Sequence, residues 1–340
     1  MRVLVVTNMY PTSASPTGGV FIELQVRSLR QLGVDVEVVH FDRGSRGPRA
    51  YWRLGKKLKQ AVERVQPALV HVAYGGVMAQ LATSAVRDRP VLVQYWGSDL
   101  LGSRAEGALR RFTIHVGVLS SRRAAGRAAG AIVVSENLRA ALPFGAAGGN
   151  VWVVPSGIDL ERFLPLDQDE SRSRLGWEGG PKHVLFPSSP RRPEKRYQLA
   201  QAAVEQLRAK GFEVELHALD GVAHTDVPTW MNASDVVLLT STHEGSPNVV
   251  KEALACNVPV VAVDVGDVRQ RLTNVQGCYV AAPTADDLAE KLGLVLSTGR
   301  RVDARDTLAE ISLERIAQRL LDIYGTVLDE KDDTAAEDAT

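Results

Sequence analysis

The stretch DVVLLTSTHEGSPNVVKEALACNVPVVAVDV, residues 235–265, decides how this chain folds. Its apolar runs 235–241 and 258–265 have the length and composition of buried strands. Between them, Ser246 has the chemistry of a helix N-cap and Pro247 that of a first helical residue, so a helix is expected from that point. Two strands joined by one helix make a right-handed β-α-β crossover with parallel strands. The stretch therefore predicts a parallel sheet covered by helices on both faces.

The same alternation continues on both sides of this stretch. In the first half, strands are expected at 2–8, 35–41, 68–74, 90–96, 131–135 and 151–156, and in the second half also at 183–188, 214–219 and 277–283. A polar interval with Gly and Pro, 159–183, separates the two series as a linker would. We expect an α/β chain with two Rossmann-like domains, 1–165 and 166–310, a helix 311–328 that packs back on the first domain, and a disordered acidic tail 329–340. Open parallel sheets bind ligands at the carboxyl ends of their strands, so the predicted site is a cleft between the two domains.

Composition limits the class of protein. The chain has 340 residues, 45% hydrophobic and 24% charged, as expected for a soluble protein of about two domains. Met1 leads directly into a strand, and there is no apolar run near the ~18 residues of a membrane span, so neither a secretion signal nor a span is expected. The two cysteines, Cys256 and Cys278, lack metal-ligand spacing and are interpreted as core residues of a cytoplasmic protein.

The net charge of zero conceals an asymmetry. Residues 1–165 contain 21 Lys and Arg against 11 Asp and Glu, which leaves 19 against 29 for residues 166–340. Much of the excess lies in the segment 103–127, where arginines alternate with apolar residues. This segment is either a solvated helical face or a surface helix pair that docks on anionic lipid. Nucleic acid is not an expected partner, because no recognition module accompanies the charge.

The loop and helix EGSPNVVKE, 244–252, carry the chemistry of a nucleotide-sugar site. A helix start presents unpaired N–H groups to phosphate, and Glu252 leans back toward that end, where its carboxylate can accept hydrogen bonds from vicinal hydroxyls. Glu244 can accept a further hydroxyl, and Gly245 lets a ligand approach the backbone. Each glutamate alone would be an ordinary surface acid; their joint placement around a strand, loop and helix favours a ligand with phosphates and hydroxyls.

Cations for a diphosphate are expected in PSSPRRPEKRYQ, 187–198, which follows the first strand of the second series. It supplies Arg191, Arg192, Lys195 and Arg196, which can bind phosphate oxygens without a metal ion. No DxD pair or His cluster suggests a metal site. Asp264 and Asp267 follow a strand and are interpreted as loop or substrate-hydroxyl contacts.

The first half offers weaker candidates. Gly18 and Gly19 end a long loop before a helix, where they would allow phosphate or sugar to approach the backbone, although a simple loop is equally consistent. The pattern is neither GxGxxG nor a Walker motif. Trp96 and Asp99 follow the strand 90–96 and could bind a sugar acceptor, although a packed Trp is the alternative.

Together these motifs resemble the retaining glycosyltransferases of family four, also called group one. EGSPNVVKE resembles the family's E-x7-E motif, and the likeness extends to the Gly-Gly loop, WGSD, VVPSGIDLERF (153–163), PEK and NASDVVLLTS. Where the family often has His or Arg, this chain has Trp96, and where it commonly has Gly-Arg, this chain has Ser189 and Pro190. The resemblance implies the GT-B fold of two facing Rossmann-like domains. It covers nearly the whole chain and is specific for the family, not for a sugar.

The resemblance also implies roles for individual residues. Glu252 would bind the ribose hydroxyls and Glu244 the donor sugar, while Lys195 and either Arg191 or Arg192 would bind the diphosphate. The remaining donor contacts would come from Gly18, Gly19, Gly245, Ser246, Pro247, Asn248 and Val249. The implied activity is metal-independent, retaining hexosyl transfer, without cofactor, from a UDP- or GDP-sugar to a sugar, lipid-linked or glycan acceptor. Such an enzyme would be cytoplasmic or peripheral on the inner face of a membrane.

Two other classes of protein fit the same elements. A sugar-nucleotide epimerase would convert the donor without any acceptor, and a two-domain solute-binding protein would bind a sugar nucleotide without turnover. The latter normally carries an export signal.

Overall fold

The computed structural model describes residues 1–13, 15, 18–41, 48–102, 107–177 and 179–337. By compactness the chain divides into two units: Met1–Gly157 together with the segment from Leu313 onward, and Ile158–Ser312. The sequence-based boundary was 165. Each unit contains one sheet, and every strand pair in both sheets is parallel, as predicted.

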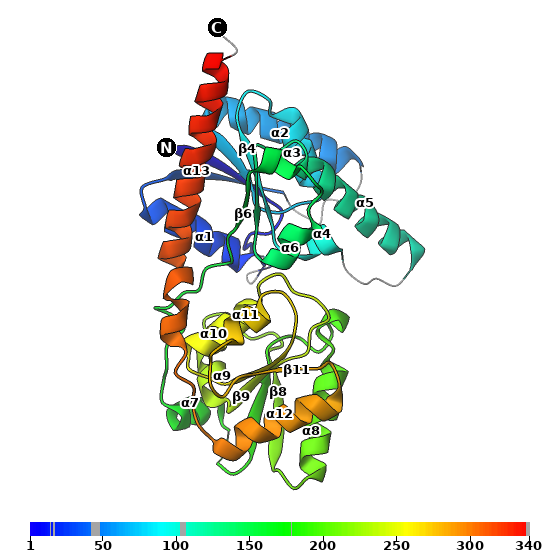
Figure 1. The fold of residues 1–340 in the computed structure, drawn as a ribbon, viewed down its shortest axis with the longest axis vertical. Helices are drawn as coiled ribbons and strands as arrows, with labels where there is room; N and C mark the ends of the chain where they lie inside the picture. Colours follow the sequence, from blue (N-terminus) through cyan, green and yellow to red (C-terminus); the bar gives the residue numbers. More distant parts are fainter. Residues whose placement is uncertain (14, 16–17, 42–47, 103–106, 178, 338–340) are drawn as a thin grey trace. The chain divides into compact units, whose positions relative to one another are not determined.

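The first unit is built on a sheet of six strands in the order β2-β1-β3-β4-β5-β6. The strands are β1 (Arg2–Thr7), β2 (Asp35–His40), β3 (Leu69–Val72), β4 (Val91–Tyr95), β5 (Gly130–Val133) and β6 (Val151–Val153). Its helices are α1 (Val20–Gln31), α2 (Pro48–Val65), α3 (Val77–Ala85), α4 (Ser98–Leu101), α5 (Ala108–Ala125), α6 (Glu136–Ala141), the 3-10 turn η1 (Ala146–Gly149) and α13 (Leu313–Glu337). Figure 1 shows these elements in the sequence colours.

The second unit has five strands in the order β11-β10-β9-β7-β8. They are β7 (Lys182–Phe186), β8 (Val214–Ala218), β9 (Val236–Leu239), β10 (Val260–Val263) and β11 (Tyr279–Ala281). The helical elements are α7 (Gln168–Leu175), η2 (Pro193–Lys195), α8 (Tyr197–Ala209), α9 (Val227–Ala233), α10 (Asn248–Ala255), α11 (Val268–Leu272), α12 (Ala285–Thr298) and η3 (Arg305–Ile311). Helices α8 and α12 lie side by side on one face (Figure 1).

The central strand β9 explains why the opening stretch decides the fold. All four of its residues are buried, as expected for a strand whose two faces are covered. Val236 and Leu238 belong to the core that α8 and α12 cover. The helix that follows, α10, covers Asn248–Ala255, where Ser246 and Pro247 predicted that a helix would start. The β-α-β prediction is confirmed here.

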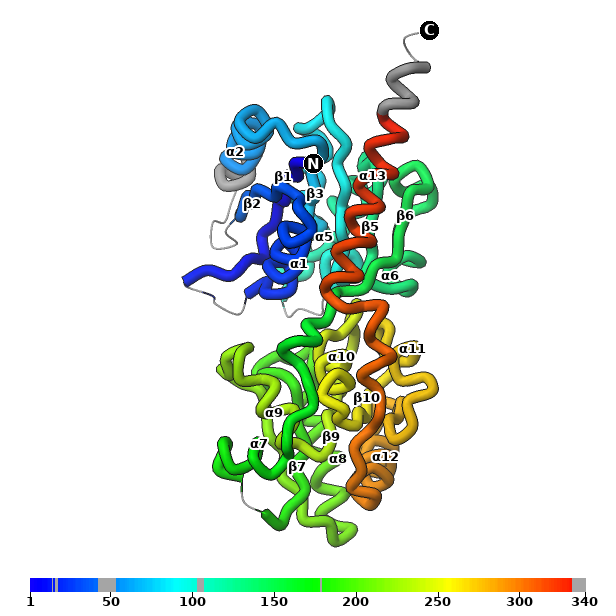
Figure 2. The backbone as a smooth tube through the Cα atoms, turned by 90° about the vertical axis from the view of Figure 1, so that its left-hand side faces the viewer, coloured from blue at the N-terminus to red at the C-terminus, as the bar shows by residue number. Residues whose placement is uncertain are grey.

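Helix α13 belongs to the first unit, where it packs along α1 (Figure 2). Tyr324 of this helix is fully buried and bonds His71 of β3, with 2.6 Å between the hydroxyl and Nδ1. The helix begins at Leu313, two residues inside the predicted range 311–328, and continues to Glu337, so it includes most of the tail that was expected to be disordered. The Glu, Lys and Ala residues there are good helix formers, which the charge-based interpretation overlooked. Residues 338–340 lie outside the described residues.

The described part of the basic segment forms a single helix, so the helix pair that was one of the two alternatives is not found there. Helix α5 spans Ala108–Ala125, while residues 103–106, with Arg104, lie outside the described part of the chain. Its apolar residues Leu109 and Phe112 are 78% and 64% exposed. Among the described helices, none is both long enough and apolar enough to cross a membrane.

Candidate functional site

The loop after β9 is joined to the segment after β7 by hydrogen bonds to backbone carbonyls. The amide of Thr242 donates to the carbonyl of Glu194 over 2.8 Å, and the Thr240 hydroxyl donates to the carbonyl of Lys195 over 2.7 Å. Arg196 lies in the left-handed region at φ 53° and donates to the carbonyls of Thr240 and Ser241. The Arg196 guanidinium, a candidate phosphate ligand in the sequence, thus holds the two segments together.

These bonds bring Lys195 and Glu244 together. The Lys195 ammonium donates to Glu244 Oε1 over 2.5 Å, and the two side chains are only 14% and 16% exposed. A charge-assisted hydrogen bond with little access to water is stronger than a surface ion pair. The predicted phosphate cation and the predicted sugar acid therefore form one unit at the carboxyl ends of β7 and β9.

The two alternative arginines lie further out. Arg191 pairs with Asp220 at 2.9 Å and is 81% exposed, whereas Arg192 pairs with Glu194 at 2.7 Å and is 57% exposed. The Arg192 guanidinium also helps to lower the pKa of Glu194, against the opposing effect of burial. The structure does not bring either arginine to the Lys195–Glu244 pair.

The start of α10 differs in detail from the prediction. Pro247 itself is the N-cap, and the helix begins at Asn248. Ser246 does not cap the helix, because its hydroxyl donates to Asp267 over 2.8 Å and accepts from Lys251 over 3.1 Å. Gly245 packs against Gly266, where a Cβ would lie 2.4 Å from the Gly245 carbonyl oxygen. The loop is thus held in place by a polar cluster of Ser246, Lys251 and Asp267.

That polar cluster was not identified from the sequence. Lys251 is fully buried, and burial lowers its pKa to about 8 although the Asp267 carboxylate opposes the effect. Asp267 also pairs with Arg271 at 2.9 Å, and Asp264 pairs with Arg269 at 2.7 Å. The two aspartates considered as loop or hydroxyl contacts are therefore each paired with an arginine.

A second group that sequence reasoning did not identify contacts Glu252, a residue that is 7% exposed. The ring of His224 has Nε2 3.5 Å from Glu252 Oε1, and its Nδ1 lies 2.9 Å from Arg162 Nη1. Since arginine can only donate, Nδ1 accepts and the proton resides on Nε2, facing Glu252. Asp159 in turn lies 4.0 Å from Arg162. Both Asp159 and Arg162 belong to VVPSGIDLERF, so this motif could have indicated the group, but not its link to His224.

The first unit contains the remaining candidates. Gly19 has φ 76°, and a Cβ there would lie 2.3 Å from the backbone of Met9, so local packing already requires glycine. A Cβ on Gly18 would lie 2.6 Å from Ser15 Oγ. Residues 14, 16 and 17 of the same loop lie outside the described residues. The positive φ and the Met9 backbone account for Gly19 without a ligand, whereas the closest atom at Gly18 is the Ser15 hydroxyl oxygen.

Trp96 lies in the turn between β4 and α4, and Asp99 lies in the first turn of α4. The Trp96 ring contacts Phe21 at 4.4 Å between centroids, and its buried Nε1 has no hydrogen-bond partner among the described residues. Asp99 is buried and accepts from the amides of Gly75, Trp96 and Gly97 at 2.8–3.2 Å. Burial raises its pKa, and these backbone donors oppose the rise. Both carboxylate oxygens are thus engaged in holding loops.

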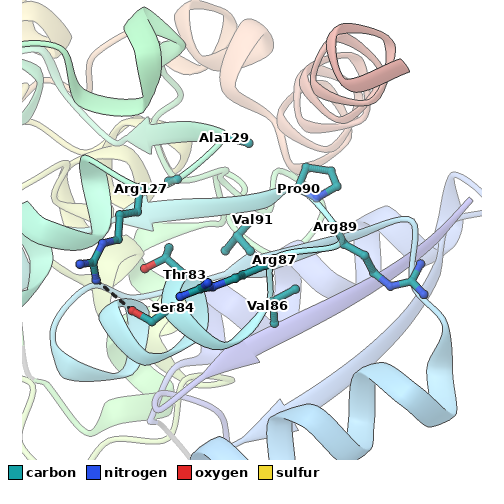
Figure 3. Close-up of a pocket in the computed structure, with 10 residues that line it drawn as sticks. Thr83, Ser84, Val86, Arg87, Arg89, Pro90, Val91, Arg127 and Ala129 are labelled. Carbon is teal, nitrogen blue, oxygen red and sulfur yellow. Dashed lines mark hydrogen bonds between the residues drawn. The ribbon is translucent and has the colours of Figure 1, made fainter. Parts of the chain in front are cut away.

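A cavity of about 730 Å³ lies elsewhere in the first unit (Figure 3). Arg87, Arg89 and Arg127 line it, and Arg127 donates to Ser84 over 3.0 Å. Pro90, which precedes β4, places it at the amino end of the sheet. Substrates of open parallel sheets bind at the opposite, carboxyl edge, so this cavity is not the expected substrate site.

Family models match both units. The model described as "Glycosyltransferase Family 4" matches residues 3–162, and that described as "Glycosyl transferases group 1" matches residues 190–298. Together the two stretches take in most of the chain, including all the candidate site residues named above. The epimerase and solute-binding alternatives lose support from this match.

Relatives and solved structures agree with the family. The "Putative teichuronic acid biosynthesis glycosyltransferase TuaC" of Bacillus subtilis is 26% identical over 86% of this chain and 88% of its own length. The "N,N'-diacetylbacillosaminyl-diphospho-undecaprenol alpha-1,3-N-acetylgalactosaminyltransferase" of Campylobacter jejuni is 25% identical over 89% and 88%. Anabaena HepE, solved with UDP and glucose, superposes with a TM-score of 0.71 at 18% identity, over 96% of this chain and 100% of HepE. This likeness supports the GT-B fold with its two Rossmann-like parallel sheets. The chain belongs to the group 1, family 4 glycosyltransferases, enzymes that move a sugar from a nucleotide-sugar donor.

Proposed function

We propose that this glycosyltransferase is a retaining, metal-independent hexosyltransferase whose donor binds at the carboxyl ends of β7 and β9. The observation that carries the proposal is the Lys195–Glu244 pair, which places a cation and an acid together beside the start of α10. In this proposal Lys195 binds the diphosphate, Glu244 a hydroxyl of the donor sugar, and Glu252 the ribose. The loop residues Gly245, Ser246, Pro247, Asn248 and Val249 supply further contacts to sugar and phosphate.

The proposed chemistry needs no protein nucleophile. The acceptor oxygen attacks the anomeric carbon on the face from which the diphosphate leaves. The new carbon–oxygen bond forms as the bond between the anomeric carbon and the diphosphate oxygen breaks. The acceptor proton passes to the leaving phosphate oxygen. Lys195 stabilises the charge that develops on the diphosphate, and the ammonium has three donors, so it can bind phosphate while it still contacts Glu244.

The first test is binding of nucleoside diphosphates. We propose that the donor nucleotide is UDP, which is supported by the UDP complex of HepE. GDP and ADP are tested for comparison. Calorimetric titration with each, with and without EDTA, should give one nucleotide that binds equally well in EDTA. Glu252→Gln should weaken this binding at least about tenfold, equivalent to ~1.4 kcal/mol, because a ribose hydroxyl bond to a charged acceptor is lost.

The matched control is Glu205→Gln on the exposed face of α8, which should leave the affinity unchanged. Lys195→Met should lower turnover at saturating donor by orders of magnitude. Turnover close to wild type in that variant would refute the role of Lys195, and a binding step that requires a divalent cation would refute metal independence.

We further propose that the acceptor is a lipid-linked glycan at the inner face of a membrane. The Campylobacter relative is named for a diphospho-undecaprenol acceptor. Helix α5 exposes Leu109 and Phe112 among its arginines, a composition that suits anionic lipid. In this proposal Trp96 contacts the acceptor sugar, and Asp99 acts by holding the loop.

Flotation with vesicles tests the membrane contact. The protein should float with phosphatidylglycerol-rich vesicles at low salt, and less so with phosphatidylcholine vesicles or at high salt. Phe112→Glu should abolish flotation, whereas Leu294→Glu, a change at a 45% exposed residue of the second unit, should not. Equal flotation of both variants would contradict the proposed surface.

A further inference from the structure

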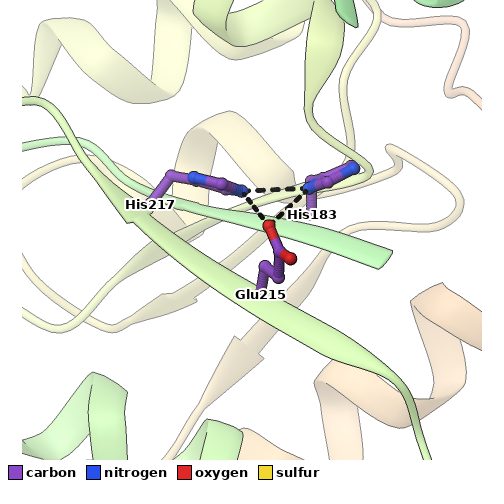
Figure 4. Close-up of side chains that lie close together, drawn as sticks. All are labelled: His183, Glu215 and His217. Atoms are coloured by element: carbon purple, nitrogen blue, oxygen red, sulfur yellow. Dashed lines mark hydrogen bonds and ion pairs between the residues drawn. The ribbon is translucent and has the colours of Figure 1, made fainter. Parts of the chain in front are cut away.

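Three ligand-type side chains meet on one face of the second sheet (Figure 4). Glu215 and His217 alternate along β8 and so point to the same side. His183 of β7 is in register with Glu215, because the two strands pair in parallel. The sheet geometry alone therefore brings His183, Glu215 and His217 together.

The distances within this group suit a metal ion. His183 Nδ1 lies 2.9 Å from His217 Nε2, and Glu215 Oε2 lies 3.7 Å and 3.4 Å from these two nitrogens. A point in the plane of the three atoms is about 2 Å from each of them, close to the ~2.0–2.1 Å of zinc–nitrogen and zinc–oxygen bonds. Little rearrangement would be needed for coordination.

A hydrogen bond accounts for only part of this arrangement. One ring N–H can bridge the two imidazoles at 2.9 Å, but the Glu215 oxygen lies beyond hydrogen-bond length from both rings. Such an approach favours a positive charge between the groups.

The surroundings fix the rings and leave an entry path. Trp177 stacks on His217 with centroids 3.8 Å apart and planes 13° apart, and Trp230 meets Trp177 edge-on at 5.4 Å. The His183 side chain is 1% exposed, His217 17% and Glu215 53%, so the group opens to solvent on the Glu215 side. An ion could enter there and keep water as a fourth ligand.

We propose that His183, Glu215 and His217 bind a divalent transition-metal ion, zinc being the best match to two imidazoles and one carboxylate. The site is separate from the donor loops, since His183 lies near the amino end of β7 and the donor loops follow the carboxyl ends. The ion would link the edge strand β8 to β7 and stabilise the second unit. It takes no part in the proposed sugar transfer, which needs no metal.

The test uses the metal alone on the full-length protein, with no nucleotide present. After EDTA treatment and its removal, Zn²⁺ titration against a chromophoric chelator should show one equivalent bound, and Co²⁺ should give the intense visible absorption of a tetrahedral complex. Bound Zn²⁺ should raise the melting temperature. Glu215→Gln should weaken Zn²⁺ binding at least tenfold, and His217→Gln should abolish the stoichiometric site.

Two control variants distinguish binding at this site from nonspecific Zn²⁺ binding elsewhere on the protein. Glu213→Gln changes an exposed acid two residues away, and His115→Gln an exposed histidine of α5; both should bind like wild type. Glu215 is largely solvent-exposed, so Glu215→Gln should fold normally even if His217→Gln does not. Zn²⁺ binding that is equal in wild type and Glu215→Gln, or absent in both, would overturn the proposal without affecting the proposed donor site.

Discussion

The buried ammonium of Lys251 should make the stability of this protein rise with pH. Lys251 is fully buried within the E-x7-E segment, between the Ser246 hydroxyl and the Asp267–Arg271 pair. Burial is the largest effect on its pKa and lowers it from 10.5 to about 8, despite the opposing attraction of Asp267. The folded state therefore releases this proton more readily than the unfolded state does.

The sign and size follow from proton linkage. Between pH 8 and 10.5 the unfolded chain binds the Lys251 proton and the folded protein does not, so the free energy of unfolding increases with pH across that range. The full effect of such a shift is about 3 kcal/mol, at ~1.4 kcal/mol per pKa unit. From pH 7 to 9.5, about 2 kcal/mol of it should appear.

The assay compares wild type with Lys251→Met, which keeps the length of the side chain and removes the titrating group. Urea unfolding is followed by tryptophan fluorescence between pH 7 and 9.5. At each pH, the free energy of unfolding of the variant is subtracted from that of the wild type, using the unfolding transition that the substitution shifts. Taking the difference cancels the titration of other groups. A difference that is flat or that falls with pH would refute the reasoning, because it would mean that ion pairing with Asp267 outweighs burial.

Three further changes in the first unit have definite expected results. Gly19→Ala should destabilise by about 1–3 kcal/mol, because of its positive φ and the contact with Met9, and thermal unfolding measures this. Asp99→Asn should lower the melting temperature, since charge-assisted bonds to backbone amides, worth ~1.5–3 kcal/mol, become neutral; no change would contradict its loop-holding role. Burial lowers the pKa of His71, which bonds Tyr324, to about 4, so on acidification the unfolded chain takes up this proton first. Relative to His71→Gln, wild type should therefore lose about 2 kcal/mol between pH 8 and pH 5, and parallel pH profiles would refute this.

Much of the fold could be predicted because strand and helix periods are local. Near-continuous apolar runs such as 235–241 are typical of strands buried on both faces, and parallel pairing is expected from the helices between them. Errors arose where local and tertiary effects compete. Pro247 suits either the N-cap or the first helical position, and the folded chain uses it as the N-cap, with an extended backbone at ψ 115°. The tail was judged by its charge, although its residues also favour the helix that continues α13.

The sequence provided candidate residues for the site but not the contacts between them. Lys195 and Glu244 are 49 positions apart, and their contact depends on the bonds between Thr242 and Glu194, which no periodicity encodes. The link from Arg162 through His224 to Glu252 likewise joins three separate segments. Composition could suggest a cation and an acid at one sheet edge, but only the folded chain shows that they neutralise each other.

The His183, Glu215 and His217 group shows what sequence reasoning can still recover. His183 lies 34 positions before His217, whereas Glu215 and His217 are two positions apart, so no metal signature of short spacing joins all three. Yet consecutive strands of an α/β unit are usually neighbours. In the parallel register of β7 and β8, Glu215 pairs with His183 and His217 pairs with Leu185. Applying strand order before searching for ligands would have brought His183 to Glu215. The pairing of β7 with β8, and not the spacing within a motif, sets the distance between His183 and Glu215.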